Sequence, residues 1–223
     1  GTNLKFKCLE KHNVRLTGRV NFYITLEATD PATGSVCSFQ TLFSDFGSCL
    51  SLGRTNCFLT SANEPVDDEW EEEDTPGINE FYKGPMPKWF SDEALERDTK
   101  KYYVVPESEL HDNDWLQLLM EVAFFSKADR CLDAYLPLEL NKVVVETLED
   151  YTTEAREKLK ADNAIFYISY KCSTDPFSVT LSGYPHLSTT LVGDHLAVVR
   201  KTMDGKPEHI SLEVSLTRKQ EKE

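Results

Sequence analysis

Apolar and polar residues alternate with the period of a β-strand near the start of the chain. Residues 4–9, LKFKCL, show this alternation, and residues 14–17 continue the strand after a bulge near His12 and Asn13. Aromatic and β-branched side chains predict the next strand over residues 22–27. Two further strands are expected in this region, a hairpin partner over residues 36–43 and edge strands within residues 49–59.

The same signals predict strands in the second half of the chain, over residues 102–105, 138–148, 164–172, 195–202 and 209–216. Asp204 and Gly205 indicate a tight turn between the last two. The segment FYISY at residues 166–170 echoes FYITL at residues 22–26. Because the order of elements is also shared, we interpret the chain as one helix-on-curved-sheet unit used twice, with the first copy lacking its helix.

Residues 111–130 carry the strongest helix pattern in the sequence. Asp112 or Asn113 is suited to cap the helix. Gln117 and Glu121 make a narrow polar line along it. One apolar stripe is expected, formed by Trp115, Leu118, Leu119, Val122 and Phe125. A helix this apolar requires cover on nearly all sides, for example by a sheet wrapped around it.

The segment between the two groups of strands is acidic and then aromatic. Eight of the eleven residues from 64 to 74 are acidic, and their mutual repulsion predicts a linker or a mobile loop. The following residues mix aromatics with Pro85 and Pro87, which forbid a helix there and favour irregular but anchored packing. Ser91 is suited to cap a short helix over residues 92–98.

The formal net charge of −14 is concentrated in the middle of the chain. Residues 64–150 have a net charge of −16, and the two flanks together have +2. Such a field repels phosphate backbones, so no nucleic-acid partner is expected. It favours a protein partner with a basic surface, although a solvated face that aids solubility explains the same charges.

The six cysteines include no CxxC pair and match no common zinc pattern, which favours buried thiols over disulfides. No stretch approaches the roughly 20 apolar residues of a membrane helix, so no membrane partner is expected. The first residues lack the apolar core of a signal peptide. We therefore expect the cytoplasm or the nucleus, and the sequence leaves open a targeting segment upstream.

Residue patterns typical of enzymes do not occur: there is no GxSxG elbow, no Gly-rich phosphate loop and no cysteine signature. His195 and His209 are expected to face each other across a hairpin as a surface pair. The acidic pairs near the helix start, Glu107 with Glu109 and Asp112 with Asp114, are explained by capping. The acidic run 67–74 lacks the spacing of an EF-hand. No catalytic residue, metal ligand or cofactor is predicted, and an enzyme is disfavoured.

Aromatic side chains cluster before the predicted helix, and two interpretations remain open for them. The set is Trp70, Phe81, Tyr82, Trp89 and Phe90. Exposed aromatics of this kind anchor protein interfaces, so the set is a candidate partner-binding patch. Packing in the core is the alternative role.

Long blocks of the chain resemble the plant Male Sterility Five family, which is expanded in crucifers and includes members labelled embryo-defective. These blocks are FYKGPMPKWFSDEAL, YYVVPESELHDNDWLQLLMEVAFFS, LPLELNKVVVETLED, ADNAIFYISY and AVVRKTMDGKPEHISLEVSL. The resemblance implies a plant protein acting in reproductive development or meiosis through protein contacts, without a known catalytic activity. Family members usually carry a helix before the block NLKFKCLEKHNVRLT, and its absence here would leave apolar sheet surface uncovered.

The first block is more distantly similar to plant cystatins, in NFYITLEATD and the strand before it. Cystatins inhibit papain-like proteases with two hairpins, and the candidate first hairpin here is NVRLTG: Asn13, Val14, Arg15, Leu16, Thr17 and Gly18. Arg15 and Leu16 are poor substitutes for the small residues of that wedge, and no Pro-Trp pair occurs. The resemblance therefore implies the fold more than the inhibition.

Together these patterns predict an α+β fold of tandem cystatin-like units, each a curved antiparallel sheet. One long helix is wrapped by the second sheet, and the first unit lacks its helix. The expected divisions are a β unit over 1–63, an acidic and aromatic segment over 64–101, a helix-plus-sheet unit over 102–217 and a disordered tail over 218–223. The leading hypothesis is a non-enzymatic protein-interaction module, and the alternative is a cystatin-like inhibitor of a papain-like protease.

Overall fold

The computed structural model describes residues 4–16, 20–45, 52–61, 78–90, 95, 98, 101–125, 135–148, 155–174, 192–203 and 209–218 of the 223-residue chain. The strands are β1 (Lys5–Leu16), β2 (Val20–Thr29), β3 (Val36–Asp45), β4 (Leu52–Ser61), β5 (Tyr102–Val104), β6 (Leu138–Glu146), β7 (Ala164–Cys172), β8 (Gly193–Thr202) and β9 (His209–Arg218). The described helices are the 3₁₀ turns η1 (Glu80–Tyr82) and η2 (Ala155–Lys160) and the α-helices α2 (Glu107–Asp112) and α3 (Asp114–Phe125).

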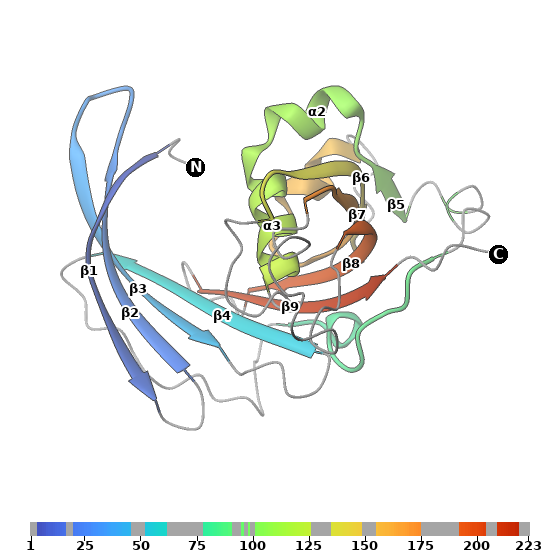
Figure 1. The fold of residues 1–223 in the computed structure, drawn as a ribbon, viewed down its shortest axis with the longest axis horizontal. Coiled ribbons are helices and arrows are strands. Elements are labelled where there is room, and N and C mark those ends of the chain that lie inside the picture. The colour runs from blue at the N-terminus through green and yellow to red at the C-terminus, as the bar shows by residue number, and fades with distance from the viewer. Residues whose placement is uncertain are drawn as a thin grey trace, which may run out of the picture.

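The nine described strands form one sheet, in the order β1-β2-β3-β4-β9-β8-β7-β6-β5. Every neighbouring pair is antiparallel, so the predicted antiparallel α+β class is confirmed. In Figure 1, β1–β4 curve away from β6–β9, and α3 lies on the concave side of the sheet. The expectation of edge strands within residues 49–59 is wrong, because β4 is bonded on both sides, to β3 and to β9.

β1 joins the two predicted strands at the start of the chain into a single one. The bulge expected near His12 and Asn13 lies earlier, because the register shifts at Phe6/Cys8 and at Leu9/Lys11. Two extra residues, one at each shift, change the alternation before His12 and leave the rest of β1 regular.

The pairing of β1 with β2 recurs in the pairing of β6 with β7. In both pairs the register shifts between a leucine and a lysine of the first strand, at Leu9/Lys11 and at Leu140/Lys142. On the second strand these shifts fall at corresponding positions of FYITL and FYISY. The paired residues are Leu9 with Leu26, Lys11 with Thr25, Leu140 with Tyr170 and Lys142 with Ser169. The sequence echo therefore falls on strands with the same register.

The correspondence extends across β1–β4 and β6–β9. One line of paired positions runs through Val14, Phe22, Phe43 and Cys57, and the matching line runs through Val145, Phe166, Val199 and Val214. Thr55 and Leu212 pair with each other where β4 meets β9. Cys57 lies two residues after Thr55, and Val214 lies two residues after Leu212. The pairings of the two halves thus repeat on either side of the Thr55–Leu212 pair.

The main core lies between α3 and the concave face of β6–β9. Helix α3 contacts β6, β8 and β9. On the sheet side, the buried residues of this core include Phe166, Ile168, Val199 and Val214. Paired positions of an antiparallel sheet face the same side, so the lines of pairing carry this concave face from β9 through β4 and β3 to β2 and β1.

The helix predicted within residues 111–130, with its cap at Asp112 or Asn113, is α3, which begins at Asp114 and directly follows the short helix α2. The Asn113 carbonyl accepts the backbone N–H of Leu116 at 2.9 Å and so begins the first turn of α3. The Asn113 amide nitrogen donates to the Glu109 carbonyl at 2.6 Å, and its Oδ1 accepts from Trp115 Nε1 at 3.2 Å. Asn113 therefore lies between the end of α2 and the start of α3. Its side chain bonds the Glu109 carbonyl and Trp115 Nε1, whereas an N-cap side chain would accept a backbone N–H of the first turn of α3.

The apolar stripe predicted on α3 is wrong. The buried side chains are Leu116, Leu119, Met120, Ala123 and Phe124. Leu118 is 59% exposed and Trp115 is 37% exposed, so the helix is not covered on nearly all sides. Because almost every position of this helix is apolar, its pattern does not indicate which side meets the sheet; packing on β6, β8 and β9 decides that. The side chain of Phe125 lies outside the described residues.

Several predicted segments lie partly or wholly outside the described residues. These are the acidic stretch 64–74, most of the helix over 92–98, the turn at Asp204 and Gly205, and most of the tail 218–223. Within the described part of the chain, no helix has the length and apolar composition to cross a membrane.

Candidate functional site

An irregular segment, residues 78–90, packs on the side of the sheet opposite α3. It meets a second buried cluster whose sheet residues are Val144, Ile165, Tyr167 and Val198. These positions alternate along their strands with residues of the main core, so they point to the other side of the sheet. The anchored packing expected for this segment is therefore confirmed.

The candidate partner-binding aromatics belong largely to this packing. Tyr82 is 2% exposed, and Phe81, Trp89 and Phe90 are partly buried against the same cluster. Trp70 lies outside the described residues. A buried Tyr82 offers no surface to a partner, so core packing explains it and accounts for much of the surface of the other three.

The contacts of these rings are specific. The rings of Trp89 and Phe90 meet the ring of Tyr167 edge-on, with centroids 5.9 and 4.6 Å away. The Tyr82 hydroxyl accepts the backbone N–H of Leu148 at 2.8 Å. Aromatic edges and a polar tip thus tie residues 78–90 to the end of β6 and to β7.

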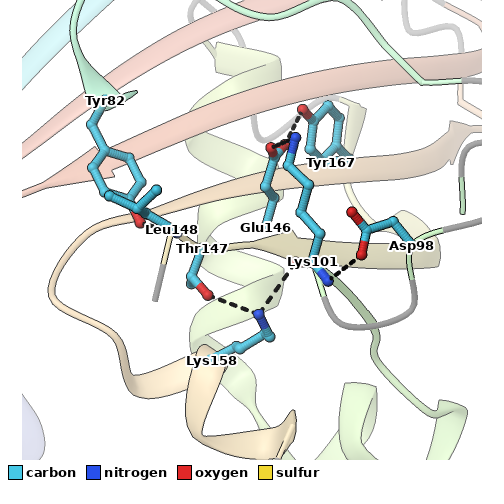
Figure 2. A network of polar contacts seen from close by, with 8 residues as sticks. All are labelled: Tyr82, Asp98, Lys101, Glu146, Thr147, Leu148, Lys158 and Tyr167. Carbon is cyan, nitrogen blue, oxygen red and sulfur yellow. Dashed lines mark hydrogen bonds and ion pairs between the residues drawn. The ribbon is translucent and has the colours of Figure 1, made fainter. Parts of the chain in front are cut away.

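A polar network adjoins these rings and centres on Glu146 (Figure 2). The Glu146 side chain is almost fully buried, and its Oε2 accepts the Tyr167 hydroxyl at 2.6 Å. Its Oε1 lies 2.7 Å from Lys101 Nζ, whose side chain is 40% exposed. The hydrogen bond to Glu146 raises the pKa of Lys101, and burial followed by the same carboxylate raises the pKa of Tyr167. The carboxylate is paired on both oxygens, as burial of a charge requires.

A second group of hydrogen bonds, also drawn in Figure 2, holds the chain in place around Lys101. Lys158 is 2% exposed, and its Nζ donates to Thr147 Oγ1 at 3.0 Å and to the Lys101 carbonyl at 3.3 Å. The Lys101 backbone N–H donates to Asp98 Oδ1 at 3.1 Å. These bonds satisfy buried polar groups where three chain segments meet, which is a structural task.

Arg200 of β8 makes another buried connection to the same segment. Its side chain is 6% exposed, pairs with Glu213 of the neighbouring strand β9 and donates to the Gly84 carbonyl at 2.8 Å. One guanidinium thus bonds both a strand partner and residues 78–90.

The titratable groups considered as catalytic candidates are scattered. Glu109 accepts the Tyr103 hydroxyl at 3.0 Å and lies 3.5 Å from Arg156 Nε. Burial, followed by the bond to Glu109, raises the pKa of Tyr103 to about 12. Among the described residues, no group of three or more His, Cys, Asp and Glu is arranged to hold a metal ion.

The expected pairing of His195 with His209 is wrong. His195 lies opposite Arg218 in the β8–β9 pair, and His209 lies opposite Phe58 of β4. The register of β8 and β9 places Thr202 opposite Ser211, so the two histidines are far apart along the ladder. The His195 side chain is buried, with its ring stacked on that of Tyr170 at 5.3 Å.

The exposed apolar side chains of β1 form a surface of a different kind. We call the open apolar surface the set Phe6, Leu9, Val14 and Leu16, which are 68%, 52%, 50% and 77% exposed. Each pairs with a β2 position on the side of the sheet that α3 covers in the other half. Next to them on β2, Phe22, Ile24 and Leu26 are half-buried. Large apolar side chains gathered on one exposed strand are typical of interaction surfaces.

The candidate inhibitor hairpin overlaps this surface. Asn13, Val14, Arg15 and Leu16 are exposed in the last part of β1, and Leu16 lies opposite Val20 of β2. Thr17 and Gly18 lie outside the described residues. The structure thus brings four of the six candidate residues to an exposed strand end.

Basic side chains accompany the apolar ones on β1. The strand carries Lys5, Lys7, Lys11 and Arg15 against one acidic residue, Glu10. Lys7 pairs with Glu27 of β2 at 2.9 Å, which raises the pKa of Lys7 and lowers that of Glu27. The β1 edge is therefore basic, although the chain as a whole has a net charge of −14.

Sequence reasoning identified part of this site. It marked residues 13–18 as a candidate hairpin but did not single out Phe6 and Leu9 as exposed or Glu146 as buried. Glu146 directly follows the apolar run VVV, and a carboxylate at the end of a buried strand is a signal that could have found it.

Comparison with known proteins gives a consistent set of relatives. Residues 86–212 match the family model described as Protein MS5. The Arabidopsis thaliana protein named UPF0725 protein At4g29550 is 35% identical over 222 residues, which are 96% of this chain and 58% of that protein. UPF0725 protein At5g63820, also from Arabidopsis thaliana, is 34% identical over 98% of this chain and 73% of its own length. The chain therefore spans part of the length of these relatives.

A solved structure has the same fold. The crystal structure of MS5 from Brassica napus matches with a TM-score of 0.68 and 26% sequence identity, over 98% of this chain and 90% of that one.

Proposed function

This chain belongs to the MS5 family, and we propose that it is a non-enzymatic module that binds a partner protein through its open apolar surface. One observation carries the proposal. The concave face of the sheet is covered by α3 over β6–β9 but ends on β1 in four exposed apolar side chains. Fully burying an exposed valine or leucine contributes about 1.5–3 kcal/mol, and Val14 and Leu16 are 50% and 77% exposed, so a partner that covers them gains part of this amount at each.

The hydrogen bonds and ion pairs of the buried polar side chains support a non-enzymatic role. Glu146, Lys158 and Arg200 are each bonded to neighbouring groups that fix the segments around the second core cluster. Such pairing accounts for their burial without a substrate.

We place the role of the module in plant reproductive development or meiosis, because the Male Sterility Five resemblance implies it. The acidic excess of residues 64–150 supports binding of a basic partner surface to this part of the chain, away from β1. The cytoplasm or the nucleus remains the proposed location.

The pairing pattern supports the finer view of the fold, two related cystatin-like units in tandem. Each unit is a run of four consecutive strands with the same register shift in its first pair. The units meet through their last strands, β4 and β9, and α3 precedes the strands of the second unit. In this scheme the first unit comprises β1–β4 without a described helix. The proposed divisions remain 1–63, 64–101, 102–217 and 218–223.

Affinity capture from flower buds tests the interaction function. The immobilised 223-residue chain is compared with the double variant Val14→Asp/Leu16→Asp and with Leu118→Asp, which alters a similarly exposed apolar residue of α3. A protein captured by the wild type is then purified and its dissociation constant is measured.

We expect the dissociation constant to rise at least about tenfold in the β1 double variant, since two buried apolar contacts become charged. The Leu118→Asp control should bind as the wild type does. Equal capture of the same proteins by both variants would exclude the open apolar surface as the binding site.

The inhibitor function remains the second candidate, because Asn13–Leu16 is exposed at a strand end. An assay with papain separates the two: micromolar inhibition that is lost in Val14→Asp/Leu16→Asp would favour the inhibitor over the adaptor.

A further inference from the structure

The two edges of the sheet are unequal. One edge is β5, which has three residues, and the other is β1, which has twelve. Among the strands that the structure describes, β1 therefore presents the longer row of outward backbone N–H and C=O groups, which is a template for strand addition.

The matching pairing patterns of β1–β4 and β6–β9 show how the open edge of β1 can be covered. β1 corresponds to β6, with Val14 at the position of Val145. The outer edge of β6 is covered by β5, where Tyr103 lies opposite Val145. A strand laid antiparallel on β1 at Val14 would repeat the β5–β6 pairing on the other half of the molecule.

The charge at this position is inverted between the halves. Arg15 of β1 corresponds to Glu146 of β6, since each follows the matching valine by one residue. Lys101, directly before β5, pairs with Glu146 at 2.7 Å. A carboxylate brought beside Arg15 would repeat this ion pair with the two charges exchanged.

The rest of β1 points to the same chemistry and against a second copy of the chain. In its regular part, Val14 and Leu16 lie on one side of the strand and Lys11 and Arg15 on the other. A strand with apolar residues beside Val14 and Leu16 and an acidic residue beside Arg15 would match both sides at once. Two copies of β1 paired antiparallel would instead bring their lysine and arginine side chains together, and like charges oppose such pairing.

We propose that β1 at Asn13, Val14 and Arg15 accepts an extended strand of a partner protein, with an acidic side chain of that strand beside Arg15. This inference rests on the proposed interaction function and names its mode and its chemistry. The open apolar surface supplies contact area, and the Arg15 position selects the charge of the partner.

Two synthetic peptides serve as probes. The first has the sequence of residues 100–105, KKYYVV, and the second has both lysines replaced by glutamate, EEYYVV. Both are labelled with fluorescein, and binding to the 223-residue chain is measured by fluorescence anisotropy. The matched variants are Arg15→Glu, at the site, and Lys5→Glu, at the far end of the same strand.

The wild type should bind EEYYVV at least about fivefold more tightly than KKYYVV, because an exposed ion pair replaces a like-charge contact. Arg15→Glu should reverse this ranking, whereas Lys5→Glu should keep it. An unchanged ranking in Arg15→Glu, or no binding of EEYYVV to the wild type, overturns the proposal. A dimer that forms in analytical ultracentrifugation and disappears in Arg15→Glu overturns it in favour of a second copy.

The peptide assay and the capture assay test two different proposals, strand addition to β1 and the interaction function. If a captured protein is lost in Val14→Asp/Leu16→Asp while EEYYVV does not bind, the interaction function stands and strand addition falls. If capture is equal in all variants and EEYYVV does not bind, both fall.

Discussion

Thr55 and Leu212 lie opposite each other where β4 meets β9, and the pairings on either side repeat symmetrically about them. Gly53 pairs with Val214 and Cys57 pairs with Ile210, so each step along one strand is matched on the other. The two halves of the sheet therefore share one concave face, which α3 covers in one half and which ends on the exposed strand β1 in the other.

The buried network predicts opposite effects for two tyrosines of β7. Tyr167→Phe removes the hydroxyl that bonds Glu146 at 2.6 Å and should lower the free energy of unfolding by about 1–2 kcal/mol. Tyr170→Phe should leave it unchanged or raise it, because the buried Tyr170 hydroxyl has no hydrogen-bond partner among the residues that the structure describes. Urea unfolding of both variants measures this, and equal losses would contradict the assignment of the network.

Arg200 should be far more important for stability than Arg156. Arg200→Met leaves Glu213 without its buried partner and removes the bond to Gly84, so we expect a loss of about 3–5 kcal/mol. Arg156→Met should change stability by less than about 1 kcal/mol, since its side chain is 57% exposed and 3.5 Å from Glu109. Thermal and urea unfolding compare the two, and limited proteolysis reports whether residues 78–90 are released.

The orientation of α3 gives a third prediction. Leu116→Ala should cost about 2–5 kcal/mol, because Leu116 is fully buried in the main core. Leu118→Ala, on the exposed side of the same helix, should stay within about 0.5 kcal/mol of the wild type. The reverse order would mean that α3 is rotated on the sheet.

Stability should fall at alkaline pH through Tyr103. Its pKa in the folded chain is raised to about 12, above the value of about 10 in an unfolded chain. The folded state therefore favours the protonated phenol, and this contribution is complete below pH about 10 and is lost as the pH rises to about 12. The raised pKa of Lys101 acts in the same direction.

Urea unfolding as a function of pH measures this loss. In Tyr103→Phe the decline over the same pH range should be less steep than in the wild type. A slope identical to that of the wild type would show that other groups carry the alkaline transition.

Local patterns were sufficient for most strands but not for their neighbours. Alternation and β-branched residues located β2, β3 and β7 within a few residues, because one face of each strand meets apolar groups. The interior place of β4 depends on pairing with β9, a contact between distant parts of the chain that no local pattern contains.

The side chains of the site were harder to assign. Tyr82 and Leu118 are both large and apolar, yet one is buried and the other exposed, because tertiary packing decides which face of a segment is covered. The inverted charge between Arg15 and Glu146 became visible through the register of two strands that are far apart in sequence.

The unequal edges of the sheet also set the stoichiometry of any assembly built on them. A sheet with two long edges can propagate into a fibre, whereas one whose far side is the three-residue β5 offers too few backbone groups there to continue a ladder. Strand addition to β1 would therefore stop after one step. A terminating, one-to-one complex is the expected outcome, and a growing chain of copies is not.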